Sequence, residues 1–193
     1  MHEKLIAYIA KHTTTPLSEN DTSLIRETFI PKKIRKRQYF LQEGEVCKYM
    51  AFLVQGAMRQ YSVDDKGTEH IVRLSIEEWW VGDRESAINL TPSIYNIDAW
   101  EESLVLTVTN ADMIKLRQIP AINELSLALD NKHAIAQQKR VNAAISLSAE
   151  QRYAELKKNY PQFLERFPQH IIASYLGITK ETLSRVRSNS LNN

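Results

Sequence analysis

The residues whose types and spacing best fit a chemical role lie near the C-terminus, between Gln169 and Val186. Within this segment a small residue, Ala173, is followed four residues later by Gly177, with apolar side chains on either side of the glycine. Two helices that cross at a small residue, and that are joined by a turn with a positive φ, have this pattern. The segment therefore predicts a helix-turn-helix.

The second helix of this motif is predicted to begin after Thr179, whose hydroxyl can cap it. Its exposed positions carry polar groups that can reach base edges and phosphates, namely Thr179, Lys180, Glu181, Thr182, Ser184 and Arg185. In a helix-turn-helix the start of the second helix enters the major groove of double-stranded DNA. Arg185 can donate two hydrogen bonds to guanine, and Glu181 can accept from the amino group of cytosine. We expect Lys180, Thr182 and Ser184 to contact phosphates.

Positive charge is concentrated in the C-terminal part of the chain, as a DNA-binding segment requires. Residues 148–193 carry seven Lys and Arg against four Asp and Glu, whereas residues 1–147 are nearly balanced. The net charge of +2 is too small to identify a partner by itself. An ordinary helical hairpin is the competing interpretation of the motif, because a single motif match does not exclude it.

Composition limits the class of protein. Hydrophobic residues make up 43% of the 193 residues and charged residues 25%, as in a folded globular chain. No apolar run approaches the roughly 20 residues of a membrane span, and the N-terminus lacks a signal-peptide layout. Cys47 is the single cysteine, so neither an intrachain disulfide nor a multi-cysteine cluster is expected. We expect a cytoplasmic protein with no membrane partner, no metal and no cofactor.

The elements that must position the motif change in character along the chain. Residues 4–12 and 18–29 have helical spacing. From residue 38 to 109 short runs rich in β-branched and aromatic residues predict strands at 39–41, 49–55, 57–63, 69–74, 94–99 and 103–108. The Asp64–Gly67 segment reads as a hairpin turn. Short strands with regular turns favour an antiparallel barrel or sandwich.

A helix without internal Pro or Gly is predicted over 121–147. Apolar residues recur in it every seven positions at Ile122, Leu129, Ala136 and Ala143, as in one seam of a coiled coil. The companion positions are only half apolar, so two interpretations stay open: a dimer seam, or a helix packed on its own barrel. Ser148 and Gln151 then form a capping-box pattern, which predicts a new helix and a domain boundary at Leu147–Ser148.

In this order the elements resemble the Crp/Fnr transcription regulators, over about residues 33–186. Glycine-marked corners such as Leu41–Glu45, Phe52–Gly56 and Val81–Asp83 carry the likeness in the first part, and Ser148–Arg187 is similar to Crp/Fnr members from Bacteroidetes. The resemblance implies an α+β fold with three parts. These are a cyclic-nucleotide-binding-like β-roll (jelly roll) with short N-terminal helices at 1–120, a dimerisation helix at 121–147, and a helix-turn-helix or winged-helix domain at 148–193.

The resemblance also implies an effector pocket in the roll, with candidate residues Gly82, Asp83, Arg84, Ser93 and Ile94. Cyclic-nucleotide-binding members use a Gly-Glu pair for the ribose and an Arg about ten residues later for the cyclic phosphate. Here Asp83 replaces the Glu and Ser93 stands at the Arg position. Losing a charge-assisted contact to a buried phosphate is costly, so we expect an effector other than cyclic AMP, of unknown identity.

The predicted function is a Crp/Fnr-type regulator that binds palindromic double-stranded DNA as a homodimer, with RNA polymerase as a candidate further partner. The alternative is a ligand-binding module whose C-terminal helices mediate protein contacts. An enzyme is not expected, because no nucleophile–base pair, metal-ligand spacing or paired carboxylate set is present in the sequence. Only seven residues follow Val186, so any wing hairpin is expected before the second helix, around Phe167–His170.

Overall fold

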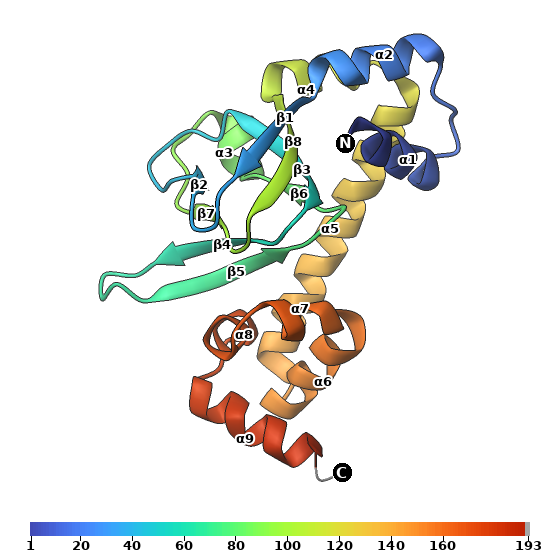
Figure 1. Cartoon of the computed structure of the whole chain (residues 1–193). Coiled ribbons are helices and arrows are strands. Elements are labelled where there is room, and N and C mark those ends of the chain that lie inside the picture. Colours follow the sequence, from blue (N-terminus) through green and yellow to red (C-terminus); the bar gives the residue numbers. More distant parts are fainter. Residues whose placement is uncertain (192–193) are drawn as a thin grey trace. The chain divides into compact units, whose positions relative to one another are not determined.

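The computed structural model describes residues 1–191. It divides into two compact units (Figure 1), which are described separately. The first comprises Met1–Gln60 and Ser75–Lys132, and the second comprises Tyr61–Leu74 and the residues from His133 onward. The predicted α+β class is confirmed, with antiparallel strands in the first part of the chain and helices in the second.

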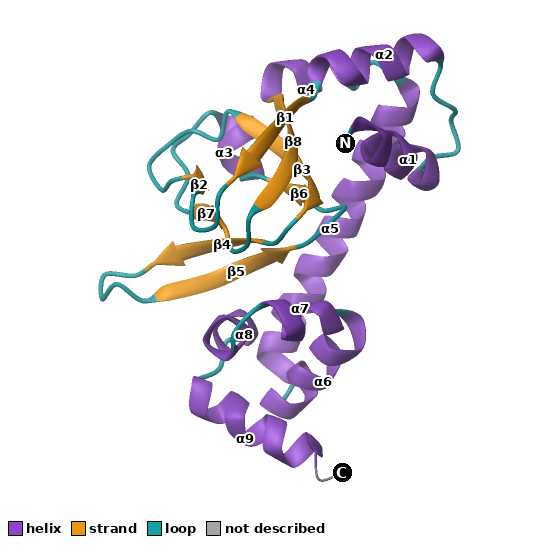
Figure 2. Cartoon of the chain, viewed as in Figure 1, coloured by secondary structure: helices purple, strands orange, loops and turns teal. Residues whose placement is uncertain are grey.

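Two four-stranded sheets form the roll, shown in orange in Figure 2, with strand orders β1-β8-β3-β6 and β2-β7-β4-β5. The strands are β1 Ile30–Ile34, β2 Tyr39–Leu41, β3 Tyr49–Gln55, β4 Met58–Val63, β5 Glu69–Ser75, β6 Trp80–Val81, β7 Asn96–Ala99 and β8 Ser103–Thr109. Strand β8 pairs antiparallel with both β1 and β3. The six predicted strands are all found, within two residues at each end.

Two strands were missed by the sequence pattern, β1 and β6. In β1 only Ile34 is buried, and the strand carries Pro31 and two lysines, so it shows no alternation of apolar and polar residues. A proline without a backbone donor is tolerated because β1 lies at the edge of its sheet. Strand β6 spans only two residues, which is too short for any periodic signal.

Helices flank the roll within the first unit. They are α1 His2–His12, α2 Glu19–Thr28, α3 Arg84–Asn89, α4 Asn110–Leu116 and the start of α5 Pro120–Ser146. One apolar core joins the N-terminal helices to sheet residues and to α5, and includes Leu5, Ile25, Phe52, Leu106 and Ile122. A second core fills the roll interior and is formed by Ile34, Leu41, Cys47, Ala51, Leu53, Met58, Val81, Ile97, Ala99 and Val105. Cys47 is a free cysteine buried in this core.

Helix α5 carries its apolar residues on two faces. The inner face includes Ile122 and Leu125, only 4% and 3% exposed in the core of the first unit, followed by half-buried Leu129. The predicted seven-residue seam begins on this face, so at this end the helix packs on its own chain and the seam prediction is wrong there. The opposite face exposes Leu127, Val141 and Ile145, at 57%, 58% and 82%.

The second unit contains the tip of the β4–β5 hairpin and a helical bundle. The bundle comprises the C-terminal part of α5, α6 Ala149–Asn159, α7 Pro161–Arg166, α8 Gln169–Leu176 and α9 Lys180–Leu191. Its core is formed by Tyr153, Leu156, Phe163, Phe167, Ile171, Ile172, Ala173, Leu176, Leu183 and Val186. The predicted capping box starts α6, since the Ser148 amide donates to Gln151 Oε1 at 2.9 Å.

No wing hairpin is present where the sequence suggested one. Between Thr109 and residue 191 the described chain contains no strand, and the Phe167–His170 segment instead leads into α8, which begins at Gln169. Pro168 directly precedes α8. Its φ is −70°, and its carbonyl accepts hydrogen bonds from the Ile171 and Ile172 amides, so the chain enters a helix directly.

Candidate nucleic-acid interface

The turn between α8 and α9 has the geometry that the motif requires. Gly177 lies in the left-handed region, with φ 65° and ψ 37°. The Gly177 amide donates to Ser174 O at 3.0 Å, and the Ile178 amide donates to Ala173 O at 3.0 Å. These bonds satisfy carbonyl groups that the end of α8 would otherwise leave unpaired. A side chain at position 177 would make this conformation unfavourable, which accounts for the glycine.

Both inner faces of the helix pair are buried as predicted. Ile172 and Ala173 of α8 are each 2% exposed, and Leu183 and Val186 of α9 are 1% and 2% exposed. The small side chain of Ala173 allows the two helices to approach at their crossing point. The buried residues of α9 are three positions apart, so the remaining positions of its first two turns face outward.

Thr179 caps α9. Its Oγ1 accepts a hydrogen bond from the Thr182 amide at 3.2 Å, and its carbonyl accepts from the Leu183 amide at 3.0 Å. Glu181 lies in the first turn, where hydrogen bonds from its own amide and from Thr179 lower the pKa of its carboxyl group. An anionic Glu181 complements the positive end of the helix dipole.

The six predicted contact residues therefore lie together on the first two turns of α9. Lys180, Glu181, Ser184 and Arg185 are exposed, Thr179 is exposed at the cap, and Thr182 is half-buried. Glu150, at the start of α6, has its carboxyl pKa lowered by its own amide, by Ser148 and by the charge of Arg185. Glu150 is therefore an acidic neighbour of Arg185, and within residues 1–191 the Arg185 guanidinium is in no ion pair. The role of these six residues in DNA binding stays a prediction.

The side chain of Arg152, in α6, lies at the C-terminal end of α8, where its Nη1 atom donates to Leu176 O at 2.8 Å. A cation at this end is favoured by the helix dipole. Arg152 thus fixes the turn that precedes α9.

A second set of contacts holds α8, and sequence reasoning missed it. Ser174 Oγ accepts from the Ile71 amide at 2.9 Å and donates to Glu69 O at 3.0 Å, so it bonds along the open edge of β5. Arg140 of α5 donates to the carbonyls of Val72, Ile71 and Tyr175, and its guanidinium lies 4.4 Å from the centre of the Tyr175 ring. We call these contacts of Arg140, Ser174 and Tyr175 the edge clasp.

The candidate effector pocket is occupied by its own side chains. Asp83 caps α3, accepting from the Glu85 amide at 3.1 Å, and its Oδ2 accepts from Ser93 Oγ at 2.6 Å. Both residues are buried, at 6% and 3% exposed. Gly82 adjoins them with φ 149°. The structure therefore brings Gly82, Asp83 and Ser93 together.

The side chains of the other two pocket candidates are not part of this cluster. Arg84 forms a two-pronged ion pair with Asp130 of α5, in which its Nη2 is 2.7 Å from Asp130 Oδ2. Arg84 is therefore a salt-bridge partner of α5. Ile94 is 63% exposed.

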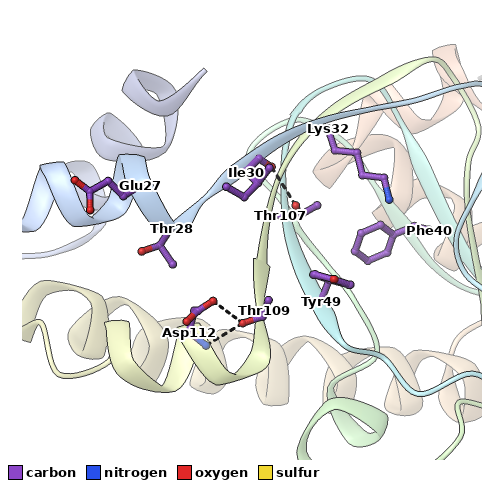
Figure 3. A pocket seen from close by; sticks show the side chains of 9 residues that line it. All are labelled: Glu27, Thr28, Ile30, Lys32, Phe40, Tyr49, Thr107, Thr109 and Asp112. Atoms are coloured by element: carbon purple, nitrogen blue, oxygen red, sulfur yellow. Dashed lines mark hydrogen bonds between the residues drawn. The ribbon is translucent and has the colours of Figure 1, made fainter.

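A hollow of about 630 Å³ lies elsewhere on the roll, in the first unit. Figure 3 shows its lining, which comes from α2, β1, β2, β3, β8 and α4: Glu27, Thr28, Ile30, Lys32, Phe40, Tyr49, Thr107, Thr109 and Asp112. Asp112 is already bonded to Thr109 and Lys115, which lowers the pKa of its carboxyl group. None of the five candidate effector residues lines this hollow.

Within residues 1–191 there is no group of three or more His, Cys, Asp or Glu side chains arranged to hold a metal ion. None of the described helices is both long enough and apolar enough to cross a membrane.

Comparison with known proteins agrees with this architecture. Residues 31–119 match the cyclic nucleotide-binding domain family. The chain is similar to FixK2 from Bradyrhizobium japonicum, with 19% identity over 83% of each chain and a TM-score of 0.69. It is also similar to a Crp/Fnr-family regulator from Eubacterium rectale, with 16% identity over 91% of this chain and 85% of that one and a TM-score of 0.67. A search of curated protein sequences gives no match.

The chain has the Crp/Fnr fold. A third structure with this fold, the catabolite activator protein of Thermus thermophilus, has 18% identity over 91% of this chain and 84% of that one, with a TM-score of 0.54. In the Crp/Fnr fold the matched segment 31–119 is the roll, and it includes the cluster of Gly82, Asp83 and Ser93. The helix-turn-helix of α8 and α9 lies outside that segment, and its assignment depends on the geometry described above.

Proposed function

We propose that the protein is a transcription regulator of the Crp/Fnr type that binds double-stranded DNA as a homodimer. The observation that carries the proposal is the α8–α9 pair: a left-handed Gly177 turn, two buried inner faces and a polar outer face at the start of α9. The similarity of 83% and 91% of the chain to FixK2 and to a Crp/Fnr-family regulator supports the same role. In functional terms we divide the chain at 120 and 147, into a sensor roll, a dimerisation helix and a DNA-binding domain.

The dimer is proposed to form along the exposed face of α5. Positions 127, 131, 134, 138, 141 and 145 alternate in steps of four and three, as the a and d positions of a coiled coil do. They carry Leu127, Asn131, Ala134, Gln138, Val141 and Ile145, all exposed. We call this set the outer stripe. A second copy of the chain presents the same stripe, so pairing about a two-fold axis would bury it.

A cytoplasmic regulator of this kind has RNA polymerase as a candidate partner once it is bound to DNA. We propose no catalytic reaction for it. A ligand-binding module whose C-terminal helices contact proteins would give no DNA retardation at low salt, and this outcome separates the two functions.

Two substitutions in α9 test the contact assignment. Arg185→Ala is expected to abolish preference for the specific site, at a cost of about 1–3 kcal/mol at one base pair, because a two-pronged guanine contact is lost. Lys180→Ala is expected to weaken binding to specific and random duplexes alike, because a phosphate contact carries no sequence information. The measurement is a titration of both duplexes at one fixed salt concentration. Equal losses on the two duplexes for Arg185→Ala would show that it contacts only phosphate.

Cyclic AMP is not expected to act as the activating ligand. Ser93 stands where cyclic-nucleotide members carry an Arg, and the Asp83 carboxylate is already bonded to Ser93. A cyclic phosphate placed there would lose its water without gaining a cation, since Arg84 is held by Asp130. Calorimetry with millimolar cyclic AMP on the wild type and Arg84→Ala tests this. Micromolar binding by the wild type would contradict the prediction, and its loss in Arg84→Ala would show that Arg84 replaces the missing Arg.

A further inference from the structure

The turn between β1 and β2 is the most strongly basic surface segment of the roll. Five of the six residues from Lys32 to Arg37 are cationic, and all five are exposed. The sixth, Ile34, is fully buried in the roll core and anchors the segment. We call the segment Lys32–Gln38 the basic turn. Nothing in the DNA-binding proposal uses it.

The backbone of the basic turn is strained at a cationic residue. The Gln38 amide donates to Arg35 O at 2.9 Å, which closes a four-residue turn, and Arg37 occupies its third position with φ 64°. This position normally takes Gly or Asn, because a positive φ is unfavourable for a residue with a larger side chain. The Arg37 amide is fixed by a 2.6 Å hydrogen bond to Ala99 O. Folding alone would favour glycine here, so the presence of an arginine points to a role for its side chain.

The cationic side chains of the turn share one hollow. Lys33, Arg35, Lys36, Arg37 and Gln38 line a depression of about 550 Å³, a size within the range of small-molecule sites. Lys33 is paired with Glu102 at 2.8 Å, and Lys36 lies 5.9 Å above the Trp100 ring. Glu101 is the other carboxylate of the adjoining β7–β8 turn. Within residues 1–191 Arg35, Lys36 and Arg37 form no ion pair.

The pocket that would be expected to take an anion in this fold is closed by its own side chains. Asp83 is bonded to Ser93, and Arg84 is paired with Asp130. Among the described residues of the roll, the basic turn brings together three consecutive cations that form no ion pair. Exposed single ion pairs contribute little in water, so a ligand held here must carry several charges at once.

We propose that the basic turn binds the oligophosphate chain of a small molecule, such as a nucleoside triphosphate. Arg35 and Arg37 supply planar donor sets that match phosphate oxygens, and Lys36 supplies a further charge held over Trp100. The gain in charge pairing offsets the conformational cost of the positive φ at Arg37. Because the site is open, binding weakens as salt concentration rises.

The test is calorimetry on the full-length protein with inorganic triphosphate, ATP and orthophosphate, each without divalent cations. Triphosphate and ATP are expected to bind at low salt, with orthophosphate weaker by about tenfold or more, because it offers fewer charges. Equal affinity for triphosphate and ATP would show that the phosphate chain alone is recognised, and tighter ATP binding would add a nucleoside contact. Absence of triphosphate and ATP binding at millimolar concentration would overturn the proposal.

Arg37→Gly is the decisive variant, because glycine accepts the positive φ without strain. We expect its melting temperature to equal or exceed that of the wild type, while triphosphate affinity falls by about five- to tenfold. Lys36→Gln is expected to give a similar loss, and the matched control Lys11→Gln, an exposed lysine of α1, none. Unchanged triphosphate affinity in Arg37→Gly and Lys36→Gln would refute the assignment. So would a loss of duplex DNA binding in these variants without any triphosphate binding, which would make the turn a DNA contact.

Discussion

The double substitution Val141→Glu and Ile145→Glu is expected to convert the protein to a monomer of 22.3 kDa and to remove high-affinity DNA binding. Both side chains are more than half exposed, so in a single chain the change alters neither apolar core. In a dimer the four introduced carboxylates would meet across the outer stripe, and buried unpaired charge is strongly unfavourable. Loss of the second half-site contact lowers affinity for a palindrome by about 10²–10⁴-fold.

Sedimentation and DNA titration on the same samples measure this effect. The matched control is Lys139→Glu, which places a carboxylate on the same helix outside the stripe and should leave the dimer intact. A dimer that persists in the double variant would contradict the assignment of the outer stripe. If the dimer persists in the double variant but is lost when a residue on the inner face of α5 is changed, the dimer forms along the predicted seven-residue seam instead.

The second large effect is expected from Arg140→Ala, which removes the centre of the edge clasp. Three backbone carbonyls lose a charged donor, and Tyr175 loses the guanidinium over its ring. Hydrogen bonds to charged groups contribute about 1.5–3 kcal/mol each, but water replaces part of this at a half-buried site. We therefore expect a stability loss of about 2–4 kcal/mol in the second unit.

Hydrogen exchange at individual backbone amides shows where in the second unit stability is lost. The Ile71 amide donates to Ser174 Oγ, so exchange at Ile71 should accelerate in Arg140→Ala and in Ser174→Ala. The neighbouring exposed residue Lys139 provides the control, since Lys139→Ala removes a charge from the same turn of α5 but no clasp contact. Unchanged exchange at Ile71 in both clasp variants would show that these contacts do not hold the strand edge.

The sequence predicted the elements whose signals are local. The helix-turn-helix could be recognised because Ala173, Gly177 and Thr179 each meet a requirement set by the backbone within a few residues. The start of α6 could be recognised for the same reason, since the side chains of Ser148 and Gln151 each accept a hydrogen bond from the backbone amide of the other residue. Strands with alternating burial were found, whereas β1 was missed because its exposed positions carry charges and a proline.

The features that were missed or misassigned depend on contacts between residues far apart in the chain. Which face of α5 packs inward is decided by the first core, where Ile122 meets residues of α1 and β3, and a heptad count alone cannot show this. The edge clasp joins Ser174 to Glu69 and Ile71, more than 100 residues away. The pairing of Asp83 with Ser93 also needed the structure, although both residues had been assigned to the same pocket.

Selection of DNA fragments by the purified full-length protein tests the central claim most directly. Double-stranded fragments recovered over several rounds are sequenced, and Arg185→Ala is carried through the same selection as a control. The account predicts a palindrome whose half-sites lie about one helical turn apart, because a two-fold dimer presents two copies of α9 to successive major grooves. Arg185→Ala should recover fragments without that palindrome. No enrichment of any sequence by the wild-type protein at low salt would contradict the account.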